Sequence, residues 1–256
     1  MFEEERLHKI GEYVQNKSRA SVQELCDLFQ VSESTIRRDL KELETRSILK
    51  RTHGGAVNFQ AVAFEPTYSE KEDQFQDEKK RIAQKAAEFI EDGDSLIIDS
   101  GTTTLYLANE LARFKDLTVV TNSIHLMQKL SVLQGINIIS TGGMLRTNTM
   151  ALAGPMAEKS LEQLHVDKAF LGTNGLNLEE GLTTPNLVEA SIKQKMIGAS
   201  DQVFVMADHT KIGCVSFARF GEISDIDACI TGNGIAKEVK SQLEKNNVKL
   251  YLTDSD

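Results

Sequence analysis

Six consecutive polar residues, Asp99 to Thr104, have the composition of a phosphate-binding loop. They read Asp-Ser-Gly-Thr-Thr-Thr, follow an apolar run and precede leucines at helical spacing. A glycine lets a ligand approach the backbone, hydroxyl groups add hydrogen-bond donors, and N–H groups at a helix start favour anions. The segment lacks the lysine of a P-loop, so it does not indicate an NTPase. A Ser/Thr helix cap is the alternative interpretation. The candidate ligands in this segment are Asp99, Ser100, Gly101, Thr102, Thr103 and Thr104.

Further polar residues follow other strand-like runs, and ligands in open α/β sheets bind beyond the carboxyl ends of strands. Arg146 would add a positive charge, although a lone arginine more often forms a surface ion pair. Asp208 and Lys211 would bind sugar hydroxyls or pair with each other in a turn. Glu189 and Lys193, one helical turn apart, are additional candidates, and an ion pair between them is the favoured alternative. The remaining candidates for the effector site are Thr121, Asn122, Gly142, Gly143, Arg146, Gly172, Asn174, Asp208 and Lys211.

A second kind of chemistry is indicated near the N-terminus, where basic residues gather. Residues 34–53 contain six Lys/Arg and three Asp/Glu, as a surface that contacts DNA phosphates requires. Arg37 or Arg38 would form two hydrogen bonds with a guanine, and the lysines would contact phosphates. A solvated helix face is the alternative. His53 would contact DNA or pack at a turn. The candidate DNA-binding residues are Ser34, Thr35, Arg37, Arg38, Lys41, Lys50, Arg51 and His53.

The elements around these basic residues have the order of a winged helix-turn-helix. Apolar residues at helical spacing predict a first helix around residues 7–14. Ser21-Val-Gln-Glu24 has the form of a capping box that opens a second helix, and Ser32 is a cap for a third. A basic strand then turns at the Gly-Gly pair of residues 54–55 into another strand. Residues 1–58 are therefore predicted to be a winged helix-turn-helix DNA-binding domain.

The rest of the chain alternates strand-like and helical runs. Residues 59–76 lose clear periodicity and are predicted to be a linker, and residues 77–256 are predicted to form a second domain. The alternation predicts the α/β class with a mainly parallel sheet covered by helices. The expected strands are Ser95–Asp99, Leu117–Thr121, Ile136–Ser140, Lys168–Gly172, Gln202–Ala207, Ala228–Thr231 and Val248–Leu252.

Composition restricts the class of protein. The net charge of −9 belongs to residues 59–256, because residues 1–58 hold ten basic and ten acidic residues. No apolar run approaches the roughly 20 residues of a membrane-spanning helix, and the acidic N-terminus does not resemble a secretion signal, so a cytoplasmic protein is expected. Cys26, Cys214 and Cys229 lie far apart, which favours free thiols over disulfides or a metal site. Neither a metal nor a cofactor is expected.

Two motifs, SESTIRRDLKELE (32–44) and LKRTHGGAV (49–57), resemble the DeoR family of bacterial transcriptional repressors. DSGTT (99–103), TNS (121–123) and TGG followed by an arginine (141–146) are similar to the sugar-phosphate-sensing domain of these repressors, which is related in fold to ribose-5-phosphate isomerases. The resemblance runs the full chain. It implies that the protein binds operator DNA and that a phosphorylated sugar changes its DNA affinity.

We therefore expect a transcriptional regulator and not an enzyme, namely a repressor of an operon for sugar uptake or catabolism. A homodimer or homotetramer is expected, because two-fold DNA sites are met by paired recognition helices. The alternative is a phosphosugar isomerase-like enzyme with an accessory DNA-binding domain. An isomerase needs a positioned base and a stabiliser for the enediolate oxygen, and the sequence offers only weak candidates for them.

Overall fold

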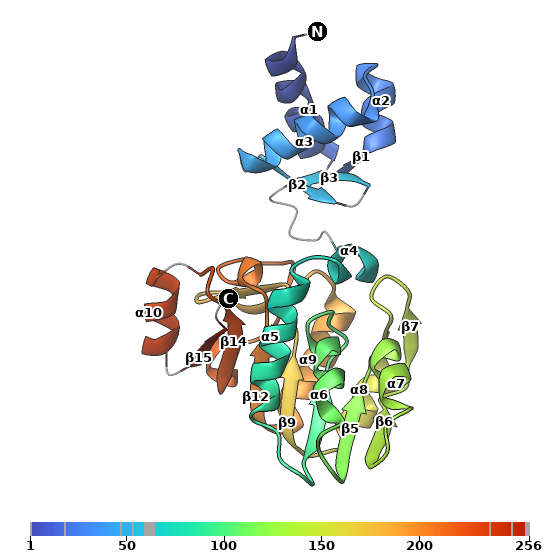
Figure 1. Cartoon of the computed structure of the whole chain (residues 1–256), viewed down its shortest axis with the longest axis vertical. Coiled ribbons are helices and arrows are strands. Elements are labelled where there is room, and N and C mark those ends of the chain that lie inside the picture. Colours follow the sequence, from blue (N-terminus) through green and yellow to red (C-terminus); the bar gives the residue numbers. More distant parts are fainter. Residues whose placement is uncertain are drawn as a thin grey trace. The chain divides into compact units, whose positions relative to one another are not determined.

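A computed structural model of the chain describes residues 2–17, 19–46, 48–52, 54–58, 65–235, 237–246 and 248–253. The chain divides into two compact units, Met1–Pro66 and Thr67–Asp256 (Figure 1), and each unit is described by itself. The second unit starts earlier than predicted. Residues 67–76, which the sequence pattern assigned to the linker, belong to it, because Tyr68 is buried in its core and its backbone N–H donates to Asn148.

The first unit consists of three helices and a small antiparallel sheet with the strand order β1-β3-β2. Both predicted helix caps are confirmed: Ser21 and Glu24 form a capping box, and the Ser32 side chain accepts a hydrogen bond from the Thr35 N–H. The strand that precedes the second helix was not predicted. The elements are α1 (Glu3–Lys17), β1 (Arg19–Ser21), α2 (Val22–Phe29), α3 (Glu33–Thr45), β2 (Leu49–Thr52) and β3 (Gly55–Asn58).

The pairing of β1 with β3 explains why a glycine stands at residue 55, the first residue of β3. A Cβ atom on Gly55 would collide with the carbonyl oxygen of Ala20, so only glycine fits where the two strands meet. Below them, the apolar faces of α1 and α3 pack together, with Ile10 and Ile36 fully buried.

A buried ion pair joins α1 to α3. The Arg6 guanidinium donates from Nε to Asp39 Oδ2 at 2.6 Å and from Nη2 to Asp39 Oδ1 at 3.1 Å. Both side chains are buried. Hydrogen bonds to Asp39 raise the pKa of Arg6 above its ordinary value, so the guanidinium stays charged although it is buried. Asp39 immediately follows the two arginines of α3, so this pair fixes the orientation of the helix that presents them.

The second unit is built on a seven-stranded parallel sheet with the order β15-β14-β12-β9-β4-β5-β6. All seven predicted strand-like runs correspond to strands of this sheet, which confirms the α/β class. The strands of the sheet are β4 (Ser95–Ile98), β5 (Leu117–Thr121), β6 (Ile136–Ser140), β9 (Val166–Leu171), β12 (Ser200–Met206), β14 (Ala228–Gly232) and β15 (Lys249–Thr253).

Two small antiparallel sheets are added, and the sequence pattern did not predict them. One is the hairpin of β7 (Met144–Arg146) and β8 (Ala151–Ala153), and the other consists of β10 (Gly175–Asn177), β11 (Gly181–Thr184) and β13 (Ala218–Gly221).

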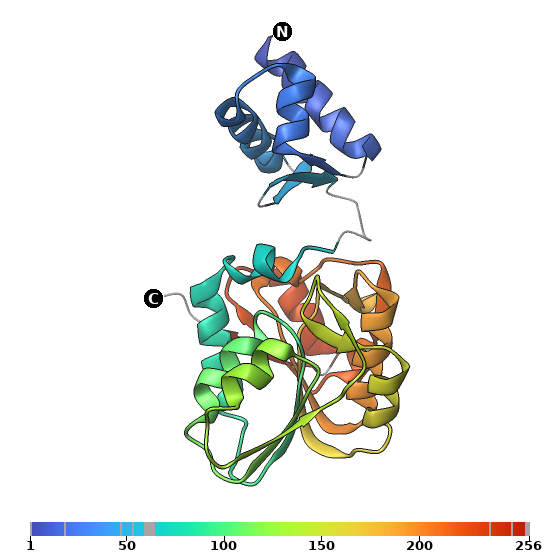
Figure 2. The same ribbon diagram turned by 90° about the vertical axis from the view of Figure 1, so that its right-hand side faces the viewer.

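Helices cover both faces of the large sheet (Figure 2). On β4, Leu96 and Ile98 face one side, where α5 packs, and Ile97 faces the other, where α8 and α9 pack. Among the described residues, no helix has the length and hydropathy to span a membrane. The helices are α4 (Tyr68–Glu72), α5 (Gln76–Ala87), η1 (Thr104–Leu107), α6 (Ala108–Leu111), α7 (Ile124–Leu130), α8 (Pro155–Leu161), α9 (Leu187–Gly198), η2 (His209–Lys211), η3 (Ile223–Asp225) and α10 (Lys237–Lys245).

The strand order reverses between β4 and β9. From β4 the chain proceeds outward through β5 and β6, whereas from β9 it proceeds in the other direction through β12, β14 and β15. At such a point the loops that follow the two neighbouring strands lead away from each other. They leave a crevice at the carboxyl ends of the strands, where ligands of open α/β sheets bind.

Candidate DNA-binding helix and effector pocket

Helix α3 carries five of the eight predicted DNA-binding residues, namely Ser34, Thr35, Arg37, Arg38 and Lys41. Arg37 and Arg38 have exposed side chains, and Ser34 and Lys41 are exposed as well. Thr35 is half-buried, and its hydroxyl and that of Ser34 lie 3.0 and 2.9 Å from the capping hydroxyl of Ser32. The exposed face that they form begins at the N-terminal end of α3, which is the part of a recognition helix that meets base edges.

Acidic side chains accompany the arginines. Arg37 pairs with Glu33 at 3.3 Å and Arg38 with Glu3 at 3.6 Å, and Arg51 on β2 pairs with Glu44 at 2.7 Å. Such exposed pairs contribute at most about 1 kcal/mol each, so DNA phosphates can displace the carboxylates. Lys50 also lies on β2, whereas His53 lies outside the described residues.

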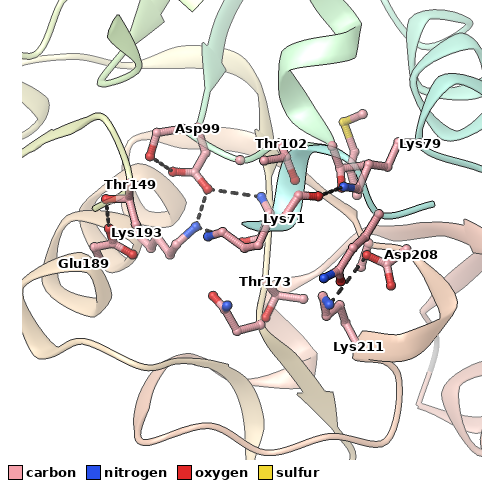
Figure 3. A pocket seen from close by; sticks show the side chains of 18 residues that line it. Lys71, Lys79, Asp99, Thr102, Thr149, Thr173, Glu189, Lys193, Asp208 and Lys211 are labelled. Carbon is pink, nitrogen blue, oxygen red and sulfur yellow. Dashed lines mark hydrogen bonds and ion pairs between the residues drawn. The ribbon is translucent and has the colours of Figure 1, made fainter. Parts of the chain in front are cut away.

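A pocket opens in the second unit where the strand order reverses (Figure 3). Its walls come from the loops after β4, β9 and β12, from α9 and from the segment around α4 and α5. The structure thus brings together residues that lie far apart in the sequence. The predicted effector-site residues that line it are Asp99, Ser100, Gly101, Thr102, Thr103, Gly172, Asn174, Asp208 and Lys211.

The loop after β4 is held in shape by its own hydrogen bonds. The Thr104 hydroxyl donates to the Asp99 carbonyl at 2.6 Å and accepts from the Gly101 N–H at 2.9 Å. The backbones of Gly101 and Gly172 approach closely, because a Cβ on either would lie 3.7 Å from the Cα of the other. Among the described residues, the N–H groups of Thr102 and Thr103 have no hydrogen-bond partner. Two N–H donors beside hydroxyl groups can therefore receive an anion.

One end of the pocket contains two carboxylates held by cations (Figure 3). Lys193 Nζ pairs with Asp99 and donates to the Gly172 carbonyl oxygen at 2.8 Å. Glu189 pairs with Arg146 and accepts a hydrogen bond of 2.5 Å from the Thr149 hydroxyl. The favoured alternative for Glu189 and Lys193 was wrong: they do not pair with each other, because each finds a partner on a different loop.

The other end of the pocket contains Lys79, Asp208 and Lys211 (Figure 3). Lys211 Nζ lies 3.7 Å from Asp208 Oδ2, so the predicted local pair forms and still lines the pocket. Burial alone would raise the pKa of Asp208, but Lys211, the Thr210 hydroxyl and Lys79 outweigh it and hold the pKa below its ordinary value. Burial lowers the pKa of Lys79 from 10.5 to about 8.

Some predicted effector-site residues do not line this pocket. Thr104 and Thr121 are fully buried, and their hydroxyl groups bond to backbone carbonyls of the β4 region. Asn122 is buried beside them, with its side-chain oxygen lacking a hydrogen-bond partner among the described residues. Arg146 does not line the pocket, but it pairs with Glu189, which does. The predicted effector-site residues that do not line the pocket are Thr104, Thr121, Asn122, Gly142, Gly143 and Arg146.

Sequence reasoning missed the contribution of the segment that follows the first unit. Lys71, Gln74 and Lys79 all line the pocket, and Lys79 Nζ also bonds to the Lys71 carbonyl oxygen. A signal for Lys79 was present. It lies three residues before Ile82 on the buried face of α5, where a lysine without a polar partner is unfavourable. Thr149 and Thr173 were missed as well.

A winged helix-turn-helix unit joined to an α/β unit with a polar, lysine-rich pocket defines a DNA-binding regulator with a ligand-sensing domain. Two family profiles agree: the DeoR-like helix-turn-helix domain matches residues 6–61, and the DeoR C terminal sensor domain matches residues 74–233. The chain belongs to the DeoR family of transcriptional regulators.

Full-length relatives support this assignment. The chain is 42% identical over 246 residues to the uncharacterized HTH-type transcriptional regulator YulB of Bacillus subtilis. The aligned region covers 96% of this chain and 95% of that protein. It is 37% identical over 256 residues to the HTH-type transcriptional repressor GlcR of Bacillus subtilis. The aligned region covers 100% of this chain and 98% of that protein. Both relatives are named as regulators rather than enzymes, as expected for this chain.

Among solved structures, ribose 5 phosphate isomerase A from Neisseria gonorrhoeae matches 54% of this chain and 54% of its own, with 21% identity and a TM-score of 0.40.

Proposed function

We propose that this regulator represses an operon for sugar uptake or catabolism and that a phosphorylated sugar in the pocket controls its affinity for the operator. The observation that carries the proposal is the pocket at the reversal of strand order. It combines unpaired N–H groups and hydroxyls of the loop after β4 with four lysines and three carboxylates. Anion donors beside carboxylates suit a ligand with a phosphate and several hydroxyls. The repressor name of a full-length relative supports the direction of regulation.

Each end of the pocket suits one part of such a ligand. The phosphate accepts hydrogen bonds from the N–H and hydroxyl groups of Thr102 and Thr103, and Lys79, a buried lysine of the same pocket, supplies a positive charge. Asp99 and Glu189 accept hydrogen bonds from sugar hydroxyls, because their ion pairs with Lys193 and Arg146 hold the carboxylates in position at the pocket wall. Both carboxylates are thereby engaged in ion pairs and are already occupied, whereas an isomerase requires a base positioned to take a proton from the substrate, so the isomerase alternative is disfavoured.

The ligand acts on DNA binding through the segment that follows the first unit. The space between the lining side chains is about 50 Å³. In this measure one water molecule needs roughly 10–15 Å³, so the enclosed part of the pocket holds only a few waters and a phosphosugar pushes lining side chains outward when it binds. Lys71 and Gln74 belong to those side chains, and they lie shortly after the boundary at Pro66. Movement there alters the connection between the units, and in a dimer or tetramer it changes the spacing of two recognition helices.

Thermal unfolding against a panel of phosphosugars tests the proposed function. A ligand at a hundred times its dissociation constant stabilises the native state by about 2.7 kcal/mol, so one phosphosugar is expected to raise the melting temperature while its unphosphorylated form does not. A Thr103→Tyr variant, with a bulky side chain in the loop, is expected to lose the shift. The same compound must bind operator-bound and operator-free protein with different affinities, since the coupling is reciprocal. Equal affinities would refute the regulatory role.

Replacing Arg37 or Arg38 with alanine is expected to weaken operator binding without affecting phosphosugar binding. An arginine that forms two hydrogen bonds with guanine contributes about 1–3 kcal/mol, which corresponds to roughly 5- to 150-fold in affinity. Fluorescence anisotropy with labelled operator DNA measures the loss. Arg113→Ala is the matched control, because Arg113 pairs with Glu110 on the second unit. Unchanged operator affinity in both α3 variants would show that this helix does not read the bases.

A further inference from the structure

The stretch between Lys129 and Glu158 is almost free of charge. It contains 28 residues, and Arg146 is the only charged one, whereas 26% of the whole chain is charged. The stretch forms β6, the hairpin of β7 and β8, and the start of α8. Depletion of charge distinguishes the centre of a protein–protein interface from the rest of a protein surface.

Large hydrophobic side chains of this stretch are exposed on three consecutive parts of the chain, namely β6, β7 and the start of α8. Ile139 on β6 is 41% exposed, Met144 and Leu145 on β7 are 71% and 45% exposed, and Met156 on α8 is 73% exposed. The Met144 methyl group comes within 3.9 Å of where a Cβ on Gly154 would lie, two residues before Met156. We call these four side chains the apolar face. Such a cluster on a charged protein marks an interaction site.

The edge of the sheet beside the apolar face is open. Within the described chain, β6 pairs only with β5, so its outer N–H and C=O groups have no strand partner (Figure 1). Proteins normally protect such an edge with lysine, proline or a bulge, and β6, Ile-Asn-Ile-Ile-Ser, has neither charge nor proline. The opposite edge strand, β15, begins with the exposed Lys249.

We infer that the apolar face and the edge of β6 are the surface through which two copies of this chain pair. Each copy carries a net charge of −9, so two copies repel unless they meet where charge is absent, and this stretch provides that place. A two-fold axis brings the same surface patch of both copies together. The β6 strands of the two copies then run antiparallel, and the open N–H and C=O groups of one edge face those of the other.

The same hairpin also contacts Glu189, a residue that lines the pocket. Arg146, at the end of β7, pairs with Glu189, and Thr149, in the turn, donates to the same carboxylate. A ligand that engages Glu189 therefore acts on the hairpin that carries Met144 and Leu145. This coupling rests on the proposed function, whereas the pairing surface does not.

The mass of the purified full-length protein in solution, measured by analytical ultracentrifugation without any ligand, tests the pairing. The unmodified chain is expected to be a dimer or larger, and the double variant Ile139→Glu/Met144→Glu is expected to have at most half that mass. Phe217→Glu, which alters a 55% exposed phenylalanine outside the stretch, is the matched control and retains the full mass. A monomeric unmodified chain, or a double variant of unchanged mass, overturns the inference. Because no ligand is present, this outcome is independent of the phosphosugar panel.

Cross-linking tests the same surface without adding charge. In a Cys214→Ser background, which removes the exposed native thiol, Met144→Cys is expected to give a covalent dimer with a short bis-maleimide, and Phe217→Cys is expected to give none. Equal cross-linking at both positions, or none at residue 144, overturns the inference, even if the charged double variant fails to fold.

Discussion

Replacing Asp39 with alanine is expected to destabilise the N-terminal unit by a large part of its total stability and to weaken operator binding strongly. The change leaves the guanidinium of Arg6 buried without its carboxylate, and breaking one partner of a buried ion pair costs about 3–5 kcal/mol. A unit of this size has roughly 3–10 kcal/mol of stability in total, at about 0.05–0.15 kcal/mol per residue. Urea unfolding, followed by hydrogen exchange in peptides of residues 2–58, measures the loss.

Two companion variants separate the buried pair from general effects of α3. Glu33→Ala removes the exposed partner of Arg37 and is expected to cost less than about 1 kcal/mol. Arg6→Met/Asp39→Leu replaces both charges with apolar groups and is expected to recover much of the stability, since well-packed hydrophobic residues often substitute for a buried pair. If Asp39→Ala costs no more than Glu33→Ala, the pair does not hold α3 in place.

Replacing Lys79 with methionine is expected to weaken phosphosugar binding by about 10- to 150-fold, because a hydrogen bond to a charged group contributes about 1.5–3 kcal/mol. Methionine retains an apolar stem of similar length, and Lys79 is 2% exposed, so the packing of α5 is largely preserved. Isothermal titration calorimetry measures the affinity. Lys80→Met is the matched control, because Lys80 is exposed and pairs with Asp77. Equal effects of the two variants would remove Lys79 from the anion site.

The pH dependence of binding provides a second signature of Lys79. Its pKa is about 8 in the free protein, and a phosphate beside the ammonium group raises that pKa. Above pH 8 the free protein has lost the proton that the complex holds, so affinity is expected to fall by up to about tenfold per pH unit. The phosphate itself, with a second pKa near 6, stays dianionic in this range. Lys79→Met is expected to lack this fall; the same fall in the variant would assign it to another group.

Local patterns predicted much of the fold. The capped helices begin where Ser21 and Ser32 indicate, and the strand-like runs form the large sheet, because hydrogen-bonding caps and apolar periodicity act over a few residues. The short strands of the β7–β8 hairpin and of β1 were missed. Three or four residues are too few for a periodic signal, and β1 exists because β3 folds back onto it.

The pocket was predicted only in part for a related reason. The loop after β4 was recognised from its own residues, but Lys71 and Lys79 have no motif, and only the tertiary fold brings them to it. Glu189 and Lys193 illustrate the limit. Helix spacing favours their pairing with each other. In the fold, Glu189 pairs with Arg146 and Lys193 pairs with Asp99 instead, both at sites shielded from water, where an ion pair is stronger. Distant residues therefore overrode the local rule.

The order of the pocket's walls along the chain has a genetic consequence. The walls begin at Lys71 and are complete only at Lys211, whereas the winged helix-turn-helix ends by residue 58. Since domains generally fold as units in the order of synthesis, a ribosome finishes the DNA-reading part first. A stop codon anywhere from residue 72 to 210 therefore removes a pocket wall and leaves the DNA-reading helices intact. Under the proposed function, frameshift alleles in that interval are expected to share one phenotype, the loss of the response to the effector, whatever their position.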